Sequence, residues 1–149
     1  MAEVLTGFHG KLPVAGDFLT RGLPTGFAAF WDAWAARHLA GRDGWPEGGV
    51  RLRLVSGGRV AAGVAVPGAD RVGRGFPLAA FLIASDLPDP AGLDPWCDAA
   101  FALLRAAQET ALSPDELDER LERLTPPEAA GGGASAGPVQ LWVAGGLAQ

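Results

Sequence analysis

Cysteine and histidine are nearly absent from this chain, and their scarcity excludes several kinds of site. Cys97 is the one cysteine among 149 residues, and His9 and His38 are the two histidines. An internal disulfide needs two thiols and a structural zinc site needs four ligands, so we expect neither a disulfide nor a metal centre. Cys97 is interpreted as a small buried hydrophobe, or as a thiol of lowered pKa at a helix start.

Long apolar runs and a basic surplus are also missing. No stretch of about 18 apolar residues occurs, and the first residues lack the pattern of a signal peptide. We therefore expect a cytoplasmic protein without membrane insertion. The net charge of −5, from 12 basic and 17 acidic side chains, argues against nucleic acid as a partner. Residues 78–149 hold 11 of the acidic side chains, which indicates either a protein-binding face or one solvated acidic helix.

The motifs of common catalytic and cofactor sites do not occur either. Gly10-Lys11 precedes Leu12 where a P-loop requires Ser or Thr, and Gly73-Arg74-Gly75 lacks the third glycine of a dinucleotide fingerprint. Neither a G-x-S-x-G nor an H-E-x-x-H sequence is found. We expect no cofactor, no metal and no catalytic residue.

What the chain does contain is a clear alternation of strand and helix patterns in one domain, residues 1–149. Ser113 and Glu116 form a capping box, and Thr25 and Asp94 are candidate N-caps. Residues 125–138 are rich in Pro, Gly and Ala, which predicts a flexible segment before the last strand. Strands are predicted at 4–9, 50–55, 60–66, 78–85 and 139–143, and helices at 26–40, from Pro95 to about Ala111, and from Pro114. This order predicts an α/β fold, in which helices pack on a mixed β-sheet.

Two loops, residues 7–24 and 67–78, combine glycine and proline with charges of both signs and phenylalanine. One interpretation is an ion-pair lattice, in which Asp17 and Asp70 pair with arginines of the same loops. The other is a concave site that binds an anion or an acidic group of a partner. The arginines and lysine in question are Lys11, Arg21, Arg71 and Arg74.

These loops resemble the signature segments of the type VI secretion-associated TagF (ImpM) family. The first segment reads Gly7-Phe8-x-Gly10-Lys11-Leu12-Pro13-x-x-Gly16-Asp17-Phe18, followed by Arg21-Gly22-Leu23-Pro24, Phe27 and Trp31-Asp32-x-Trp34. The second reads Asp70-Arg71-Val72-Gly73-Arg74-x-Phe76-Pro77-Leu78, and Leu141-Trp142 is similar to the family's late tryptophan segment.

The resemblance implies a three-layer α/β sandwich and a non-enzymatic regulator. Such a regulator is a post-translational repressor that binds type VI secretion components, among them the forkhead-associated scaffold protein, and works with a separate PP2C-type phosphatase. The implied signature residues are Lys11, Asp17, Arg21, Asp32, Asp70, Arg71 and Arg74, with the aromatics Phe8, Phe18, Trp31, Trp34 and Phe76.

Two other functions stay open. One is a small-ligand or phosphate-handling enzyme that would use Lys11, Asp17, Asp70 and Arg71 of the two loops. The other is a structural subunit of the secretion apparatus, held at fixed stoichiometry.

Overall fold

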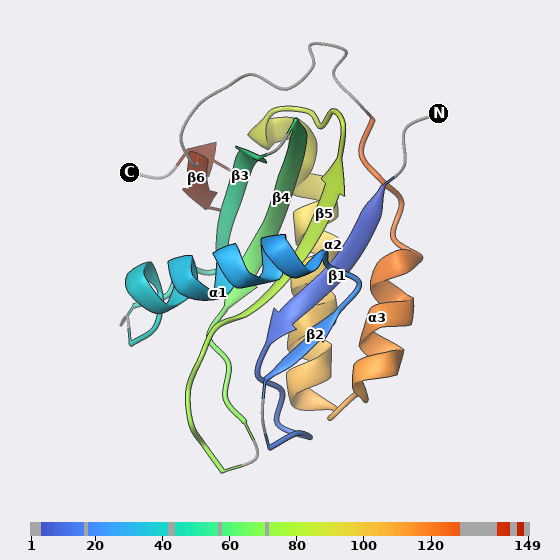
Figure 1. Ribbon diagram of the computed structural model, residues 1–149. Coiled ribbons are helices and arrows are strands. Elements are labelled where there is room, and N and C mark those ends of the chain that lie inside the picture. Colours follow the sequence, from blue (N-terminus) through green and yellow to red (C-terminus); the bar gives the residue numbers. More distant parts are fainter. Residues whose placement is uncertain are drawn as a thin grey trace.

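The computed structural model contains a seven-stranded β-sheet with helices on both faces (Figure 1). It describes residues 4–16, 18–41, 44–56, 58–70, 72–128, 140–143 and 146–147. The elements are β1 (Leu5–Gly10), β2 (Leu19–Arg21), α1 (Thr25–His38), β3 (Val50–Ser56), β4 (Arg59–Val66), β5 (Leu78–Ala84), α2 (Pro90–Glu109), α3 (Pro114–Glu122), β6 (Gln140–Val143) and β7 (Gly146–Leu147).

The strand order is β2-β1-β5-β4-β3-β6-β7, and every pairing among the described strands is antiparallel. The expected mixed sheet is wrong in this respect. Short connections produce the antiparallel pairs: β3 and β4 form the predicted hairpin, in which Val55 faces Val60, and one loop joins β4 to β5. Antiparallel neighbours need no crossover helix, so the helices are free to cover both faces.

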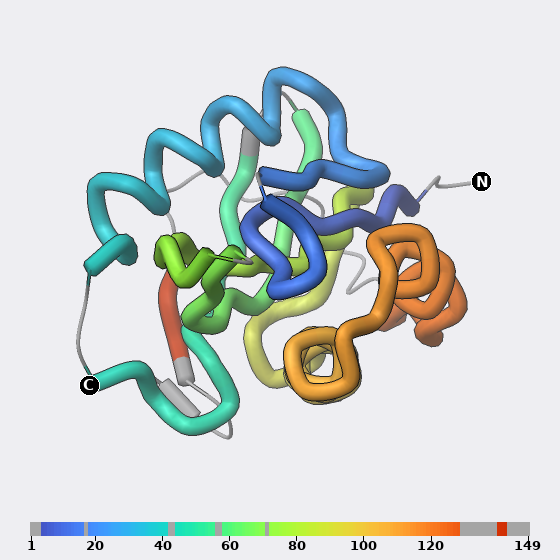
Figure 2. Tube along the Cα trace, turned by 90° about the horizontal axis from the view of Figure 1, so that it is seen from below, coloured from blue at the N-terminus to red at the C-terminus, as the bar shows by residue number. Residues whose placement is uncertain are grey.

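The sheet is the middle of three layers, which confirms the predicted α/β sandwich. Figure 2 shows α1 on one side of the sheet and α2 with α3 on the other. Strand β5 is buried along its whole length, because alternate side chains enter the two cores. Leu82 packs in the core beneath α2 and α3, while Phe81 and Ile83 pack in the core beneath α1.

Two of the three predicted helix starts are wrong. Helix α2 begins at Pro90, and its N-cap is Asp89, whose carboxylate accepts a hydrogen bond from Gly92 N at 3.0 Å. Pro95 therefore lies inside the helix, and the turn before it is stabilised by the fully buried Leu93. Helix α1 begins at Thr25 itself, after Pro24, and has no side-chain cap.

The third predicted start is confirmed. Ser113 Oγ accepts a hydrogen bond from Glu116 N, and Glu116 accepts one from Ser113 N, so the capping box closes in both directions.

Two short strands, β2 and β7, were not predicted. β2 lies within a segment rich in glycine and proline, which favours a loop, yet it pairs with β1 at the sheet edge. Val139 and most of the segment predicted to be flexible, residues 129–138, lie outside the described residues.

Candidate functional site

The two signature segments meet at one end of the sheet. The β1–β2 loop (residues 11–18) and the β4–β5 loop (residues 67–77) lie together at the lower end of the sheet in Figure 1. Glycine makes the contact possible, because a Cβ on Gly10 would lie 2.3 Å from Pro77 O and one on Gly68 would lie 3.1 Å from Lys11 O. Gly10 also has a φ of 145°, which disfavours other residues.

Asp70 is the centre of this contact. One carboxylate oxygen accepts from Lys11 Nζ at 3.2 Å and from Arg74 Nε at 2.8 Å. The other accepts from the backbone N–H groups of Val72 and Arg74, each at 3.0 Å. The carboxylate is completely buried, and the Lys11 ammonium that reaches it is nearly so. The ion pair between the two loops is thus shielded from water.

These contacts fix the charge of Asp70. Burial alone would raise the pKa of its carboxyl group, but the hydrogen bonds from Arg74 N, Lys11 and Val72 N outweigh that effect and lower the pKa of Asp70 to about 2. Asp70 is therefore ionised at neutral pH, and its negative charge compensates the buried lysine.

An aromatic group covers the same ion pair. Lys11 Nζ lies 4.9 Å above the centroid of the Phe18 ring, and Phe18 meets Phe76 edge to face at 4.9 Å. The Arg74 guanidinium reaches across to Gly16 O at 2.8 Å. Charge and aromatic contacts therefore hold the two loops in one arrangement.

His9 extends the site toward α1, and the sequence did not single it out as a site residue. Its Nδ1 lies 2.6 Å from Thr20 Oγ1, and its Nε2 lies 2.9 Å from Asp32 Oδ1. The ring stacks on Phe18 at 5.9 Å. No local sequence pattern could have revealed this contact, because Thr20 comes to lie beside His9 through the pairing of β1 with β2.

The predicted site residues divide into three groups. Lys11, Phe18, Asp70, Arg74 and Phe76 come together as described. Phe8 and Trp31 are fully buried in the two cores, on opposite faces of the sheet, and serve the fold. Asp17 and Arg71 lie outside the described residues.

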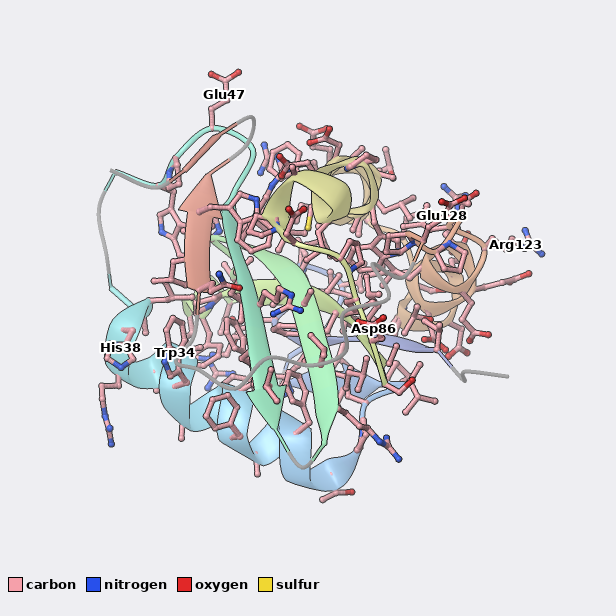
Figure 3. The ribbon with its side chains drawn as sticks, turned by 90° about the horizontal axis from the view of Figure 1, so that it is seen from above. Trp34, His38, Glu47, Asp86, Arg123 and Glu128 are labelled. Atoms are coloured by element: carbon pink, nitrogen blue, oxygen red, sulfur yellow. The ribbon has the colours of Figure 1, made fainter. Side chains whose placement is uncertain are left out.

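The remaining predicted residues lie at the margins of the site. Arg21 points to α3, where its Nε lies 3.5 Å from the exposed Asp115. Asp32 is bound to His9, and Trp34 stacks on Trp31 at 5.5 Å and contacts His38 at 4.7 Å (Figure 3). Asp70 pairs with Arg74, as the lattice interpretation describes, and Lys11, which that interpretation did not include, pairs with the same carboxylate.

A second cluster of charges lies under α2, and the sequence did not reveal it. Arg51 is 1% exposed and donates to Asp94 at 2.8 Å and to Asp98 at 2.7 Å. Trp142 Nε1 also donates to Asp94, at 2.8 Å. Burial opposes the charge of Arg51, but the hydrogen bonds to Asp98 and Asp94 outweigh it and hold the pKa of Arg51 above its ordinary value.

Cys97 is the buried hydrophobe of the first interpretation. It is fully buried on α2, and burial raises the pKa of its thiol to about 12. Among the residues that the structure describes, no group of three or more His, Cys, Asp or Glu side chains is arranged to hold a metal ion. In the same part of the chain, no helix has the length and apolarity that a membrane crossing requires.

The geometry favours a contact surface over an anion pocket. Asp70 already engages the nearly buried ammonium of Lys11, so this cation is not left for a free phosphate. What faces outward is Phe18, 42% exposed, Val72, 68% exposed, and the exposed side of Arg74. Exposed apolar groups beside an arginine are typical of protein interfaces.

The fold and the site together define a class: an α/β sandwich whose two glycine-rich loops are held against each other by a buried ion pair and aromatic contacts. A family model described as the TagF N-terminal domain, type VI secretion system-associated, matches residues 7–44 and 50–124. The chain belongs to this family. The match includes both signature loops, and the family description names no enzymatic activity.

A solved structure supports the same assignment. PA0076 from Pseudomonas aeruginosa PAO1 is 31% identical in sequence, with a TM-score of 0.68, over 83% of this chain. The match covers 64% of PA0076, so this chain spans less than two thirds of that protein. No curated protein matches the chain.

Proposed function

We propose that this protein is a non-enzymatic regulator of type VI secretion that represses assembly after translation, through protein–protein contact in the cytoplasm. The observation that carries the proposal is the family match, which covers the whole of both signature loops. The proposed partner is the forkhead-associated scaffold protein, and a separate PP2C-type phosphatase would act with it.

The signature loops are the proposed contact surface. A binding surface gains affinity when its loops are ordered in advance, because less entropy is lost on association. The buried Asp70–Lys11 pair and the Phe18–Phe76 contact supply that order here. Phe18 and Arg74 are then the candidate anchors, since aromatic and arginine side chains dominate binding energy in protein interfaces.

The phosphate-handling enzyme receives less support from the same geometry. Its proposed cation Lys11 and its proposed base Asp70 form a buried pair with each other, and the depressed pKa of Asp70 makes this carboxylate a weak base. A screen of phosphate esters and nucleotides tests this function. Turnover that Lys11→Ala abolishes would support it.

A secretion assay tests the regulatory proposal. We expect deletion of the gene to raise secretion and the intact protein to restore repression. Val72→Glu should fail to restore it while keeping its fold, because the substitution places a charge on an exposed apolar residue of the contact surface and leaves the backbone hydrogen bond from Val72 N to Asp70 in place. Arg105→Glu is the control, since Arg105 is an exposed arginine on α2 whose partners among the described residues are Gln108 and Glu109 of the same helix. Unchanged secretion after deletion would contradict the proposal.

A further inference from the structure

The outer face of α1 is unusual for a surface helix. Such a helix normally presents charged and polar side chains to solvent. The exposed residues along most of this helix are instead small or apolar, at helical spacing: Gly26, Ala29, Phe30, Ala33 and Ala36. The carboxylate of α1, Asp32, is bound to His9. The helix thus offers a largely apolar outer surface, and its one carboxylate is half-exposed and held by a hydrogen bond to His9.

A groove opens where the first turns of α1 cross β4 and β5. Its volume is about 450 Å³, and its walls are mainly apolar. Phe27 meets the core residue Phe81 edge to face at 4.9 Å, and Phe30 leans on Phe27 at 6.2 Å. Phe27 is therefore fixed by its contact with the core, while Phe30 is 42% exposed. The lining residues are Pro24, Gly26, Phe27, Phe30, Arg59, Ala61 and Ile83.

Uncompensated positive charge borders this apolar surface. Arg59 lines the groove and is exposed, and its guanidinium has no hydrogen-bond or ion-pair partner among the described residues. Arg37 is likewise exposed and without such a partner in the described part of the chain. It lies near the far end of α1, beside His38, which Figure 3 labels next to Trp34. From Phe27 to Arg37 the helix advances about 15 Å, at 1.5 Å per residue.

We propose that the groove and the outer face of α1 form a second binding surface, for an acidic, apolar peptide segment of a partner protein. A leucine or aromatic side chain of the segment would enter the groove against Phe30. A neighbouring carboxylate would pair with Arg59, and a second acidic residue further along would reach Arg37.

This surface is separate from the place where residues 11–18 meet residues 67–77. Arg59 begins β4, and the β4–β5 loop follows the last residue of that strand, Val66. Eight residues of extended strand place the two about 23 Å apart. A partner could therefore contact each surface on its own, and a substitution in one should leave binding to the other unchanged.

Charge complementarity selects the occupant. In a symmetric dimer through this face, each copy would present the same cations, Arg59 and Arg37, to the other. No free carboxylate lies among the described residues of the groove to compensate them. An anionic membrane is a poor match, because surface-binding helices combine many basic residues with a large apolar face, and α1 has one arginine and one histidine.

The test is a selection from a displayed library of random 16-residue peptides on the intact protein, with counter-selection against Phe30→Glu. We expect enriched peptides to carry Leu, Phe or Trp beside Asp or Glu. Their affinity should fall at least 10-fold for Phe30→Glu and about 3-fold to 10-fold for Arg59→Glu, and added salt should weaken binding.

Val72→Glu is the matched control, because it places the same charge on an exposed apolar residue of the β4–β5 loop. It should leave the affinity of these peptides unchanged. The proposal would be overturned if no peptide were enriched or if the enriched peptides were basic. It would also be overturned if the peptides bound the Arg59→Glu variant as tightly as the native protein. If sedimentation shows a dimer that Phe30→Glu dissociates, the face binds a second copy of the chain. If the protein binds anionic vesicles and Arg59→Glu abolishes that binding, the face binds a membrane. Either result overturns the peptide proposal.

Discussion

The molecule contains two clusters of aspartate and basic side chains, and they are built in opposite ways. At the signature loops a buried carboxylate, Asp70, is surrounded by basic groups, one of which, Arg74, is 62% exposed. Under α2 a buried guanidinium, Arg51, is surrounded by carboxylates, of which Asp98 is 65% exposed. One cluster presents positive charge to solvent and the other presents negative charge.

The positions of the clusters explain the contrast. The Arg51 cluster joins β3, α2 and β6, three elements that must stay together for the fold to exist. The Asp70 cluster joins two loops beyond the ends of the strands. Disruption of the first should therefore reduce global stability, whereas disruption of the second should mainly alter a surface. The following predictions test this difference, from the largest effect to the smallest.

Arg51→Ala should have the largest effect on stability. The substitution leaves Asp94 and Asp98 without their shared partner and opens a cavity beneath α2, so we expect a loss of about 3 kcal/mol in the free energy of unfolding. Urea denaturation measures it. Arg105→Ala, which removes an exposed arginine from the same helix, should cost about 0.5 kcal/mol or less. Equal effects of the two substitutions would show that the Arg51 cluster contributes little.

Asp70→Asn should have a smaller global effect and a strong local one. The amide keeps an oxygen acceptor but leaves the nearly buried ammonium of Lys11 without a countercharge. We expect Tm to fall by about 5 °C and amide exchange to rise in both signature loops, with the α2 amides unaffected. Asp115→Asn, which removes the exposed partner of Arg21, should leave Tm unchanged. Uniformly faster exchange across the sheet would contradict a local role.

The stability difference between the native protein and Asp70→Asn should depend on pH. The pKa of Asp70 is lowered to about 2 in the folded state, below the value of about 3.9 for an unfolded aspartate. The stabilisation is therefore complete above about pH 5 and is lost as the pH falls toward 2. Thermal unfolding at several pH values should show the two Tm curves converging over that range. A constant difference would mean that the charge of Asp70 is not what matters.

Ser113→Ala should have the smallest effect of the series, about 1 kcal/mol, because it removes one half of the capping box of α3. The backbone N–H of Ser113 and, to a smaller extent, its hydroxyl lower the pKa of Glu116. The substitution keeps the N–H and removes the hydroxyl, so that pKa should rise part of the way toward its ordinary value. Urea denaturation measures the first effect and NMR titration of the Glu116 carboxyl measures the second. A pKa of Glu116 that does not move would indicate that the box is open in solution.

Local patterns in the sequence predicted local structure well. The capping box at Ser113 was correct because all its partners lie within four residues. The start of α2 was not, because two Asp-Pro pairs occur five residues apart. The structure uses Asp89 as the cap and Asp94 as a partner of Arg51 and Trp142, residues 43 and 48 positions away. Nothing within a short window distinguishes these two roles.

The same limit applies to the clusters. Alternation in residues 50–55 predicted a half-buried strand, yet both arginines there, Arg51 and Arg53, are buried. Their charged face is covered because α2 supplies carboxylates and residues 87 and 88 supply carbonyl oxygens. The signature loops, in contrast, could be recognised from the sequence because their residues are contiguous. That Asp70 holds Lys11 as well as Arg74 depended on the pairing of β5 with both β1 and β4.

A calorimetric titration of this protein with the forkhead-associated scaffold protein of the same bacterium tests the central claim most directly. We expect binding in the micromolar range or tighter, weakened at least 10-fold by Arg74→Glu or Val72→Glu and unchanged by Arg105→Glu. Absence of binding to both the phosphorylated and unphosphorylated scaffold would contradict the proposed partner. If the affinity for the scaffold were unchanged by Arg74→Glu and Val72→Glu, the assignment of the signature loops as the contact surface would be contradicted.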